Sequence, residues 1–295
     1  MPFKSKPTIG IITVPLSPDR PHAKRCGDSY VSSSYIDWLK KAGLEVLPIP
    51  YTTIDHQYYF DRINGLYFPG GSVFASNDEA YYRCCKKFFE LAVQANNRGD
   101  YFPIWAVCLG MQQMMIIAEG NDNMKLLEEF DSYNHLKLPL HFTIDGLKSR
   151  LMTYLLEENP KMLAVMHDYP ITINNHMMGL SPAKYNTLPK LKSFFRIVSY
   201  NYCRQGKQFI STIEAYDYPF YGFQWHPESD PAMYNMGRFL ENETRKNKHT
   251  TKKISKKLEM QHLEVNCSRS TGIYRVCHFY WHTKVPQSTI KACHL

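Results

Sequence analysis

The sequence lacks a run of about twenty apolar residues, the length that a membrane-spanning helix needs. We therefore expect no stable membrane insertion. Its first residues, Met-Pro-Phe-Lys-Ser-Lys-Pro, lead straight into an apolar segment without the small-residue cleavage site of a signal peptide. These residues leave a cytoplasmic location open, unless a signal was removed or missed in the gene model.

The sequence also lacks a disulfide framework and a regular metal motif. Its eight cysteines are scattered over 295 residues, and none forms a Cys-x-x-Cys pair. A chain of this length can bury a core without disulfides. Cysteines and histidines near the C-terminus lack the spacing of a zinc finger, so we predict no bound metal.

Acidic residues are scarce only near the C-terminus. The net charge is +8, but residues 245–295 carry eleven Lys or Arg and two Asp or Glu, a local balance of +9. The rest of the chain therefore sums to −1. A basic tail is more often solvated than bound to phosphates, so we expect no nucleic-acid partner.

Apolar strands alternate with helical patterns in the first half of the chain, and no internal repeat is visible. This order predicts an α/β fold with a mostly parallel central sheet flanked by helices, whose sites form at the carboxyl ends of the strands. The predicted strands are 8–14, 45–49, 63–68, 102–107, 171–174, 196–200, 209–214 and 220–224, and the predicted helices are 29–42, 79–97, 110–118 and 233–242.

The pattern changes near residue 247. The segment RKNKHTTKKISKK is strongly charged, and the residues after it have no clear periodicity. We therefore divide the chain into a domain over residues 7–247 and a basic, poorly ordered extension over residues 248–295.

Cys108 lies between an apolar strand and a helix, in Trp105-Ala-Val-Cys-Leu-Gly-Met-Gln112. A nucleophile on a tight strand-to-helix turn is exposed above the sheet, and the helix N-terminus favours the thiolate. The amide of Leu109 could hold an oxyanion, and so could amides at Gly70 and Gly71, which follow another strand. The alternative is a buried free cysteine, a common fate for this residue.

A strand ends at His226, and Glu228 follows two residues later, within Gln-Trp-His-Pro-Glu. A thiol hydrolase needs a base that takes the thiol proton and a partner that orients this base. We therefore assign His226 as the base and Glu228 as its partner. A surface histidine at a strand end is the alternative.

In this order, the residues resemble the class I glutamine amidotransferase-like superfamily and, more closely, its γ-glutamyl hydrolase family of cysteine peptidases. The resemblance covers about residues 7–247. It rests on INGLYFPGGSV at 63–73, GDYFPIWAVCLGMQ at 99–112, FISTIEAYDYPFYGFQWHPE at 209–228 and NETRKN at 242–247.

The resemblance implies roles for further residues. It places a second histidine near the substrate at His176, and it places Tyr30 and Ser33 in the region that lines the glutamate pocket. Gln112 stands where this family usually has Glu, and glutamine is typical of amidotransferases. The segment after Glu228 is shorter than in the family pattern.

By this resemblance, the chain hydrolyses γ-glutamyl bonds of folate or antifolate poly-γ-glutamates through a thioester, without a cofactor. The resemblance also implies a lysosomal, vacuolar or extracellular location, and a homodimer stays open. Two alternatives remain. One is another glutaminase-like or γ-glutamyl hydrolase of the superfamily, which Gln112 favours. The other is an inactive homologue that acts as a binding protein.

Overall fold

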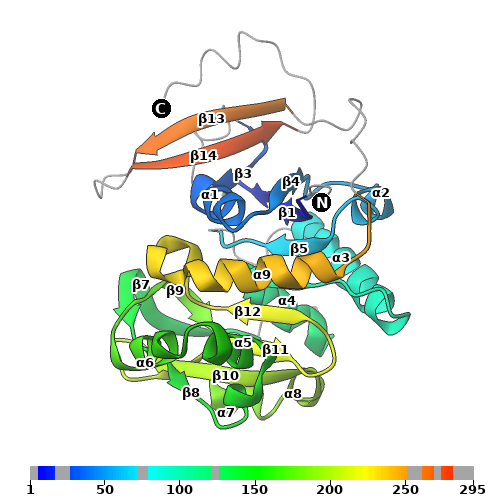
Figure 1. The fold of residues 1–295 in the computed structure, drawn as a ribbon. Coiled ribbons are helices and arrows are strands. Elements are labelled where there is room, and N and C mark those ends of the chain that lie inside the picture. The colour runs from blue at the N-terminus through cyan, green and yellow to red at the C-terminus, as the bar shows by residue number, and fades with distance from the viewer. Residues whose placement is uncertain are drawn as a thin grey trace.

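An eight-stranded sheet forms the centre of the molecule (Figure 1). The computed structural model describes residues 6–16, 27–71, 79–120, 126–250, 261–268 and 274–281. Five neighbouring strands of this sheet pair in parallel, and the three strands beyond them pair antiparallel. In spatial order, the strands are β4 (Glu45–Ile49), β1 (Thr8–Ile12), β5 (Gly65–Phe68), β6 (Ile104–Val107), β12 (Phe220–Phe223), β11 (Gln208–Ala215), β10 (Phe195–Tyr202) and β8 (His141–Phe142).

Helices cover both faces of this sheet, as the sequence predicted. Successive strand residues point to opposite faces, so Leu66 and Phe68 join one apolar cluster while Tyr67 joins the other. The first cluster packs against α2 (His56–Phe60), α3 (Glu79–Asn97), α4 (Leu109–Glu119), α7 (Pro182–Tyr185) and α8 (Pro189–Phe194). The second packs against α1 (Ser33–Lys41), α5 (Arg150–Glu158), α6 (Pro160–Asp168) and α9 (Tyr234–Lys246).

The strand register brings three segments to one edge of the sheet. Phe68 of β5 pairs with Ala106 of β6, and Val107 of β6 pairs with Phe223 of β12. All three strands run in parallel, so the residues that follow them emerge together. The glycine turn after β5, Cys108 after β6 and the segment after β12 therefore meet at the carboxyl edge.

Several elements differ from the sequence prediction, and helices α2, α5, α6, α7 and α8 were not predicted. Ser29–Ser32, predicted as the first turn of a helix, is instead strand β3, and α1 begins only at Ser33. Tyr30 pairs with Val14 of β2 (Val14–Pro15), so tertiary pairing overrides the local helical pattern. A separate two-stranded sheet joins β7 (Glu128–Leu138) to β9 (Thr172–Gly179). Strand β7 was not predicted.

The C-terminal extension contains regular structure. Strands β13 (Gln261–Ser268) and β14 (Tyr274–Trp281) form an antiparallel hairpin, and β14 pairs with β3. Figure 1 shows this hairpin at one end of the molecule, beyond α1. No strand pattern was recognised here from the residues alone. One of the two partners of β14 is the adjacent β13, and the other, β3, lies more than 240 residues earlier in the chain. The division at residue 247 stays a prediction, and the remainder of the extension from residue 251 lies outside the described residues.

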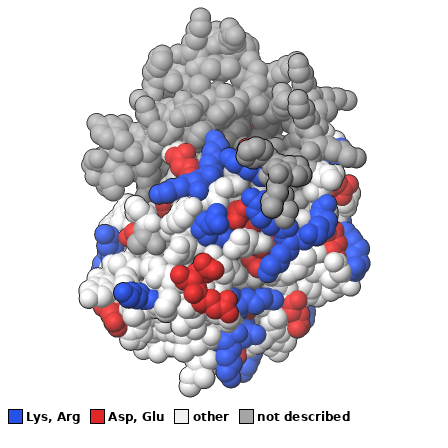
Figure 2. Space-filling model, viewed as in Figure 1, with Lys and Arg blue, Asp and Glu red and all other residues white. Residues whose placement is uncertain are grey.

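Acidic and basic side chains are interspersed on the face that carries α9 (Figure 2), in keeping with a body that is close to neutral. Among the described residues, none of the helices combines the length and the apolar character needed to cross a bilayer.

Gly110 permits the close contact between α4 and β5. A Cβ built at this position would lie 2.0 Å from the Phe68 carbonyl oxygen, a backbone atom that cannot turn aside. We expect Gly110→Ala to lower the free energy of unfolding by about 3 kcal/mol, because the helix must shift against a packed strand. Urea denaturation checks this value. Gly237→Ala in α9 is the control: its Cβ would meet Ala42 at 3.0 Å, and the gain in helix propensity offsets that contact. Equal losses in both variants would contradict the interpretation.

Candidate active site

Cys108 occupies a strained turn between β6 and α4. Its φ of 52° and ψ of −109° lie where a residue with a Cβ is rarely found. Its amide donates to the Phe223 carbonyl at 2.6 Å, which anchors the turn to β12. Backbone strain of this kind is kept where the surrounding structure fixes a functional side chain. The turn has the form of a nucleophile elbow, with the thiol at the N-terminus of an eleven-residue helix.

His226 and Glu228 form a buried pair beside this thiol. The Nδ1 atom of His226 lies 2.8 Å from Oε1 of Glu228, and the carboxylate side chain is only 2% exposed. The Cys108 side chain also hydrogen bonds to His226. Because Nδ1 is hydrogen bonded to Glu228, Nε2 is the ring nitrogen that is available to the thiol. This arrangement is the one that a nucleophile, a base and an orienting carboxylate would need.

These partners change the proton affinity of His226. Burial alone lowers the pKa of the imidazole, because it penalises the charged form. The Glu228 charge and the hydrogen bonds to Cys108 and Glu228 outweigh burial and raise the pKa of His226 from 6.5 to about 10. The imidazolium therefore persists at neutral pH, and it can donate a proton to a leaving group.

Tyr35 of α1 is a site residue that the sequence analysis missed. Its hydroxyl oxygen lies 3.3 Å from Nδ1 of His226 and accepts a 3.0 Å hydrogen bond from the Gly70 amide. Burial and the Glu228 charge raise the pKa of Tyr35 well above its ordinary value, so the hydroxyl stays protonated. The only sequence signal is its position two residues after Ser33, in the segment already predicted to line the pocket.

Gly70 lies where the side chains of Tyr35, Cys108 and His226 converge. A Cβ at this position would meet the Tyr35 hydroxyl at 2.4 Å, the His226 ring at 3.0 Å and the Cβ of Cys108 at 3.2 Å. No side chain larger than a hydrogen fits there without displacing them. The glycine after β5 is therefore needed for close approach, not for an unusual backbone conformation.

Gly71 and Leu109 are adjacent. A Cβ on Gly71 would lie 3.1 Å from a methyl carbon of Leu109. Within the described ranges, neither backbone amide donates to a protein acceptor, and the Leu109 amide belongs to the first turn of α4. Two such amides beside a nucleophile can stabilise a developing oxyanion. The Gly70 amide, by contrast, is already bonded to Tyr35.

His176 and Gln112 meet at one carbonyl beside the triad. Nδ1 of His176 lies 3.0 Å from the Met178 oxygen, and the Gln112 amide donates to the same oxygen at 2.8 Å. Burial lowers the pKa of His176 to about 3, and the positive charge of His226 adds to this effect. His176 is therefore neutral, and its buried Nε2 has no hydrogen-bond partner among the residues that the structure describes.

The other predicted site residues lie in the β3–α1 segment. Tyr30 sits in β3 and packs against the first apolar cluster, and Ser33 begins α1. Neither is in a described contact with Cys108 or His226, so their place in a substrate pocket stays a prediction. Within the described ranges, no three His, Cys, Asp or Glu side chains are grouped so that they could hold a metal ion.

We expect Tyr35→Phe to lower kcat about tenfold with little change in KM, because the hydroxyl fixes both the glycine turn and the imidazole. Steady-state kinetics and thermal melting measure the two effects. Tyr185→Phe is the matched control. It removes a 2.5 Å hydrogen bond from a buried tyrosine hydroxyl to the Phe195 carbonyl, outside this site. The control should lose stability and keep kcat. A similar fall in kcat for both would reduce Tyr35 to a purely structural residue.

Comparison with known proteins agrees with this geometry. The peptidase C26 family model matches residues 7–228. "Gamma-glutamyl hydrolase B" of Dictyostelium discoideum is 34% identical over 266 residues, which cover 84% of this chain and 74% of that protein. "Gamma-glutamyl hydrolase" of Homo sapiens is 34% identical over 270 residues (85% and 81%), and that of Rattus norvegicus is 38% identical over 229 residues (77% and 68%).

A solved structure supports the fold alone. A candidate GMP synthase component from Thermoplasma acidophilum superposes with a TM-score of 0.53 at 12% identity, covering 82% of this chain and 96% of the other. The region matched by the family model contains the elbow, the glycine turn and the His-x-Glu segment described above. From these findings, the chain belongs to the peptidase C26 family.

Proposed function

We propose that this chain hydrolyses γ-glutamyl bonds of folate or antifolate poly-γ-glutamates, with Cys108 as the nucleophile. The observation that carries the proposal is the contact of a strained-turn thiol with an imidazole that a buried carboxylate orients. Family membership and the names of the relatives supply the bond type.

The mechanism follows from the positions of these groups. The Cys108 thiolate attacks the side-chain carbonyl carbon of a γ-glutamyl residue, and the amides of Gly71 and Leu109 hold the oxyanion. His226 then gives its proton to the leaving α-amine, so the C–N bond breaks and a thioester remains. Water, deprotonated by His226, attacks the thioester and releases the carboxylate product and the thiol.

The neighbourhood of the triad supports one role each for two further residues. The neutral, buried His176 presents an unpaired acceptor nitrogen within the described part of the chain, which suits a donor group of a substrate. Gln112 donates hydrogen bonds to the Met178 carbonyl at 2.8 Å and to Gln224 at 3.3 Å. We therefore assign it to the positioning of strand β9, which contains Met178. No metal or organic cofactor enters these steps.

One assay separates the proposal from its alternatives. The protein is incubated with pteroylpentaglutamate and, separately, with glutamine, and the products are analysed by chromatography. Shortened folates support the proposal. Ammonia from glutamine alone supports another glutaminase-like enzyme, and a folded protein that turns over neither substrate supports a binding protein.

Location forms a second, smaller part of the proposal. We propose the lysosome, the vacuole or the extracellular space, as the resemblance implies. The Asn242-Glu-Thr sequon is compatible with passage through the secretory route. The Asn242 side chain is exposed on α9. A shift in gel mobility after treatment of the native protein with an endoglycosidase would support this route, and fractionation with cytosolic markers would contradict it.

A further inference from the structure

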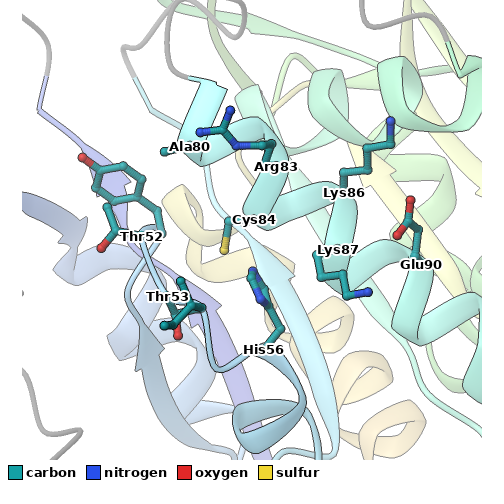
Figure 3. Close-up of a pocket in the computed structure, with 11 residues that line it drawn as sticks. Thr52, Thr53, His56, Ala80, Arg83, Cys84, Lys86, Lys87 and Glu90 are labelled. Carbon is teal, nitrogen blue, oxygen red and sulfur yellow. The ribbon is translucent and has the colours of Figure 1, made fainter.

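A cavity opens at the same edge of the sheet as Cys108, and none of its lining residues belongs to the Cys108–His226–Glu228 group. Its volume is about 480 Å³. Figure 3 shows its two walls: Thr52, Thr53 and His56 after strand β4 form one, and the N-terminal half of α3 forms the other. Tyr51, which follows β4, packs its ring against that of Tyr81 in α3 at 6.4 Å, so the two walls are in contact.

The α3 wall carries mainly positive charge. Arg83, Lys86, Lys87 and Glu90 line the cavity, and their spacing of three, one and three residues places them on one face of the helix. Three cations therefore face one carboxylate. An anion in the cavity gains attraction from several charges at once. Arg83 and Lys87 are exposed, so each of these interactions is weakened by solvent and salt.

His56 supplies an uncharged polar group on the opposite wall. One of its ring nitrogens bonds to the Ile54 backbone, while Nε2 is buried and has no hydrogen-bond partner in the described part of the chain. The ring is fixed edge-on against Phe88 at 5.2 Å. A buried nitrogen without a partner costs free energy unless a ligand or a water satisfies it. Because the other ring nitrogen donates to the Ile54 carbonyl, Nε2 is an acceptor, and this second observation points to a ligand that carries a donor such as an amide N–H.

The position of the cavity relates it to the catalytic thiol. Strands β4 and β6 are separated by β1 and β5, hence by three strand spacings of about 4.8 Å each, or about 14 Å. An α-linked residue spans about 3.5 Å when extended, and a γ-linked residue adds two carbons, so each one spans about 6 Å. The α3 wall stands above one face of the sheet, so the path to Cys108 is longer than this in-plane spacing. About three or more γ-glutamyl residues are needed to bridge the two positions.

We propose that this cavity binds carboxylates of an oligo-γ-glutamate chain, about three or more residues away from the bond that is cleaved at Cys108. The link to catalysis rests on the proposed function, whereas binding of the oligo-γ-glutamate to the cavity does not. An oligo-γ-glutamate carries one free α-carboxylate per residue, so its charges recur at intervals that Arg83 and Lys87 can meet in turn. The cavity thereby selects substrates by tail length.

The test is an equilibrium binding experiment in the full chain with Cys108→Ala, which removes turnover. Fluorescently labelled penta-γ-glutamate and di-γ-glutamate are titrated against this protein and against the same protein with Arg83→Gln/Lys87→Gln. The control is Lys190→Gln/Lys192→Gln in α8. That pair removes the same charge, but α8 leads into β10 at the opposite edge of the sheet, where Phe195 pairs with Ala215 at the end of β11.

We expect the cavity variant to bind the pentamer about fivefold more weakly, while the dimer and the control change less than twofold. Added salt should narrow the difference. The inference would be overturned if the cavity variant lost the same affinity for the dimer as for the pentamer, or if the control lost as much affinity as the cavity variant. It would also be overturned if the cavity variant bound the pentamer as tightly as the unsubstituted cavity does. Hydrolysis by the unsubstituted chain is measured separately. Absence of hydrolysis would contradict the proposed function, and the binding data would still test the role of the cavity.

Discussion

Cys108→Ala is expected to reduce hydrolysis of a γ-glutamyl substrate by at least about 10⁴-fold while the protein stays folded. Alanine keeps the backbone of the elbow and removes the sulfur, so no thioester can form. The remaining amides and imidazole cannot replace a missing nucleophile. Stopped assays under saturating substrate measure kcat, and circular dichroism with thermal melting checks the fold.

Cys203→Ala is the matched control for this substitution. Cys203 is also a buried free cysteine, 4% exposed, but it packs with Phe130 and Phe209 away from the elbow. The control should retain turnover within about twofold and lose only the stability that a small cavity costs. Retained activity in Cys108→Ala, or an equal loss in both variants, would remove Cys108 from its assigned role.

Glu228→Gln is expected to lower kcat/KM by about 10²- to 10⁴-fold and to change its dependence on pH. The amide keeps the volume of the carboxylate but carries no charge and can present a donor to Nδ1, which disfavours the required imidazole tautomer. Since Glu228 is almost fully buried beside His226, solvent cannot replace its charge.

The direction of the pH change follows from the pKa of His226. In the folded protein that pKa is raised from 6.5 to about 10, chiefly by the Glu228 charge acting against burial. Removal of the charge leaves burial less opposed, so the pKa falls. The alkaline limb of the kcat/KM profile, where the imidazolium is lost, should therefore move to lower pH.

The same shift affects stability. A folded pKa above the unfolded value means that proton binding stabilises the fold. This stabilisation is complete below pH 6.5 and is lost as the pH rises towards 10. In Glu228→Gln this pH-dependent loss should become smaller, which urea denaturation at about pH 6 and about pH 10 can measure.

Glu214→Gln serves as the control for a buried carboxylate outside the site. Glu214 accepts from the backbone amides of Arg150 and Leu151 at the start of α5 and is 1% exposed. The substitution should lower the melting temperature and leave the alkaline limb of kcat/KM in place. If both variants moved that limb equally, the raised pKa of His226 could not be attributed to Glu228.

Local sequence patterns were sufficient to predict most of the parallel half of the fold. Helix α3 matches its predicted range of 79–97, and β4 matches 45–49, because each has a strong periodicity and a clear stop. The fold class and the family were also predicted, and both are confirmed. The sheet of β7 and β9 was harder to predict, since β7 is a long strand with many polar residues and little alternation.

The order of chemical groups along the chain was likewise visible in the sequence. A cysteine, a glycine turn and a His-x-Glu segment each follow an apolar strand, and parallel strands end at a common edge. This reasoning reaches only residues that stand at strand ends. It placed Cys108, His226 and Glu228 at one edge, and their catalytic roles stay predictions that the variants above test.

The sequence by itself therefore predicted which residues act as nucleophile and base, and it determined the kind of sheet that carries them, because these depend on short motifs and local periodicity. Only the tertiary structure decided that the Tyr35 hydroxyl accepts a hydrogen bond from Gly70 and approaches His226, a residue 191 positions away. The same holds for the pairing of β14 with β3. The physical reason is that such contacts join segments far apart in the chain, and local periodicity does not specify a distant partner. Nothing in either segment encodes its partner, and packing of the whole chain brings the two together.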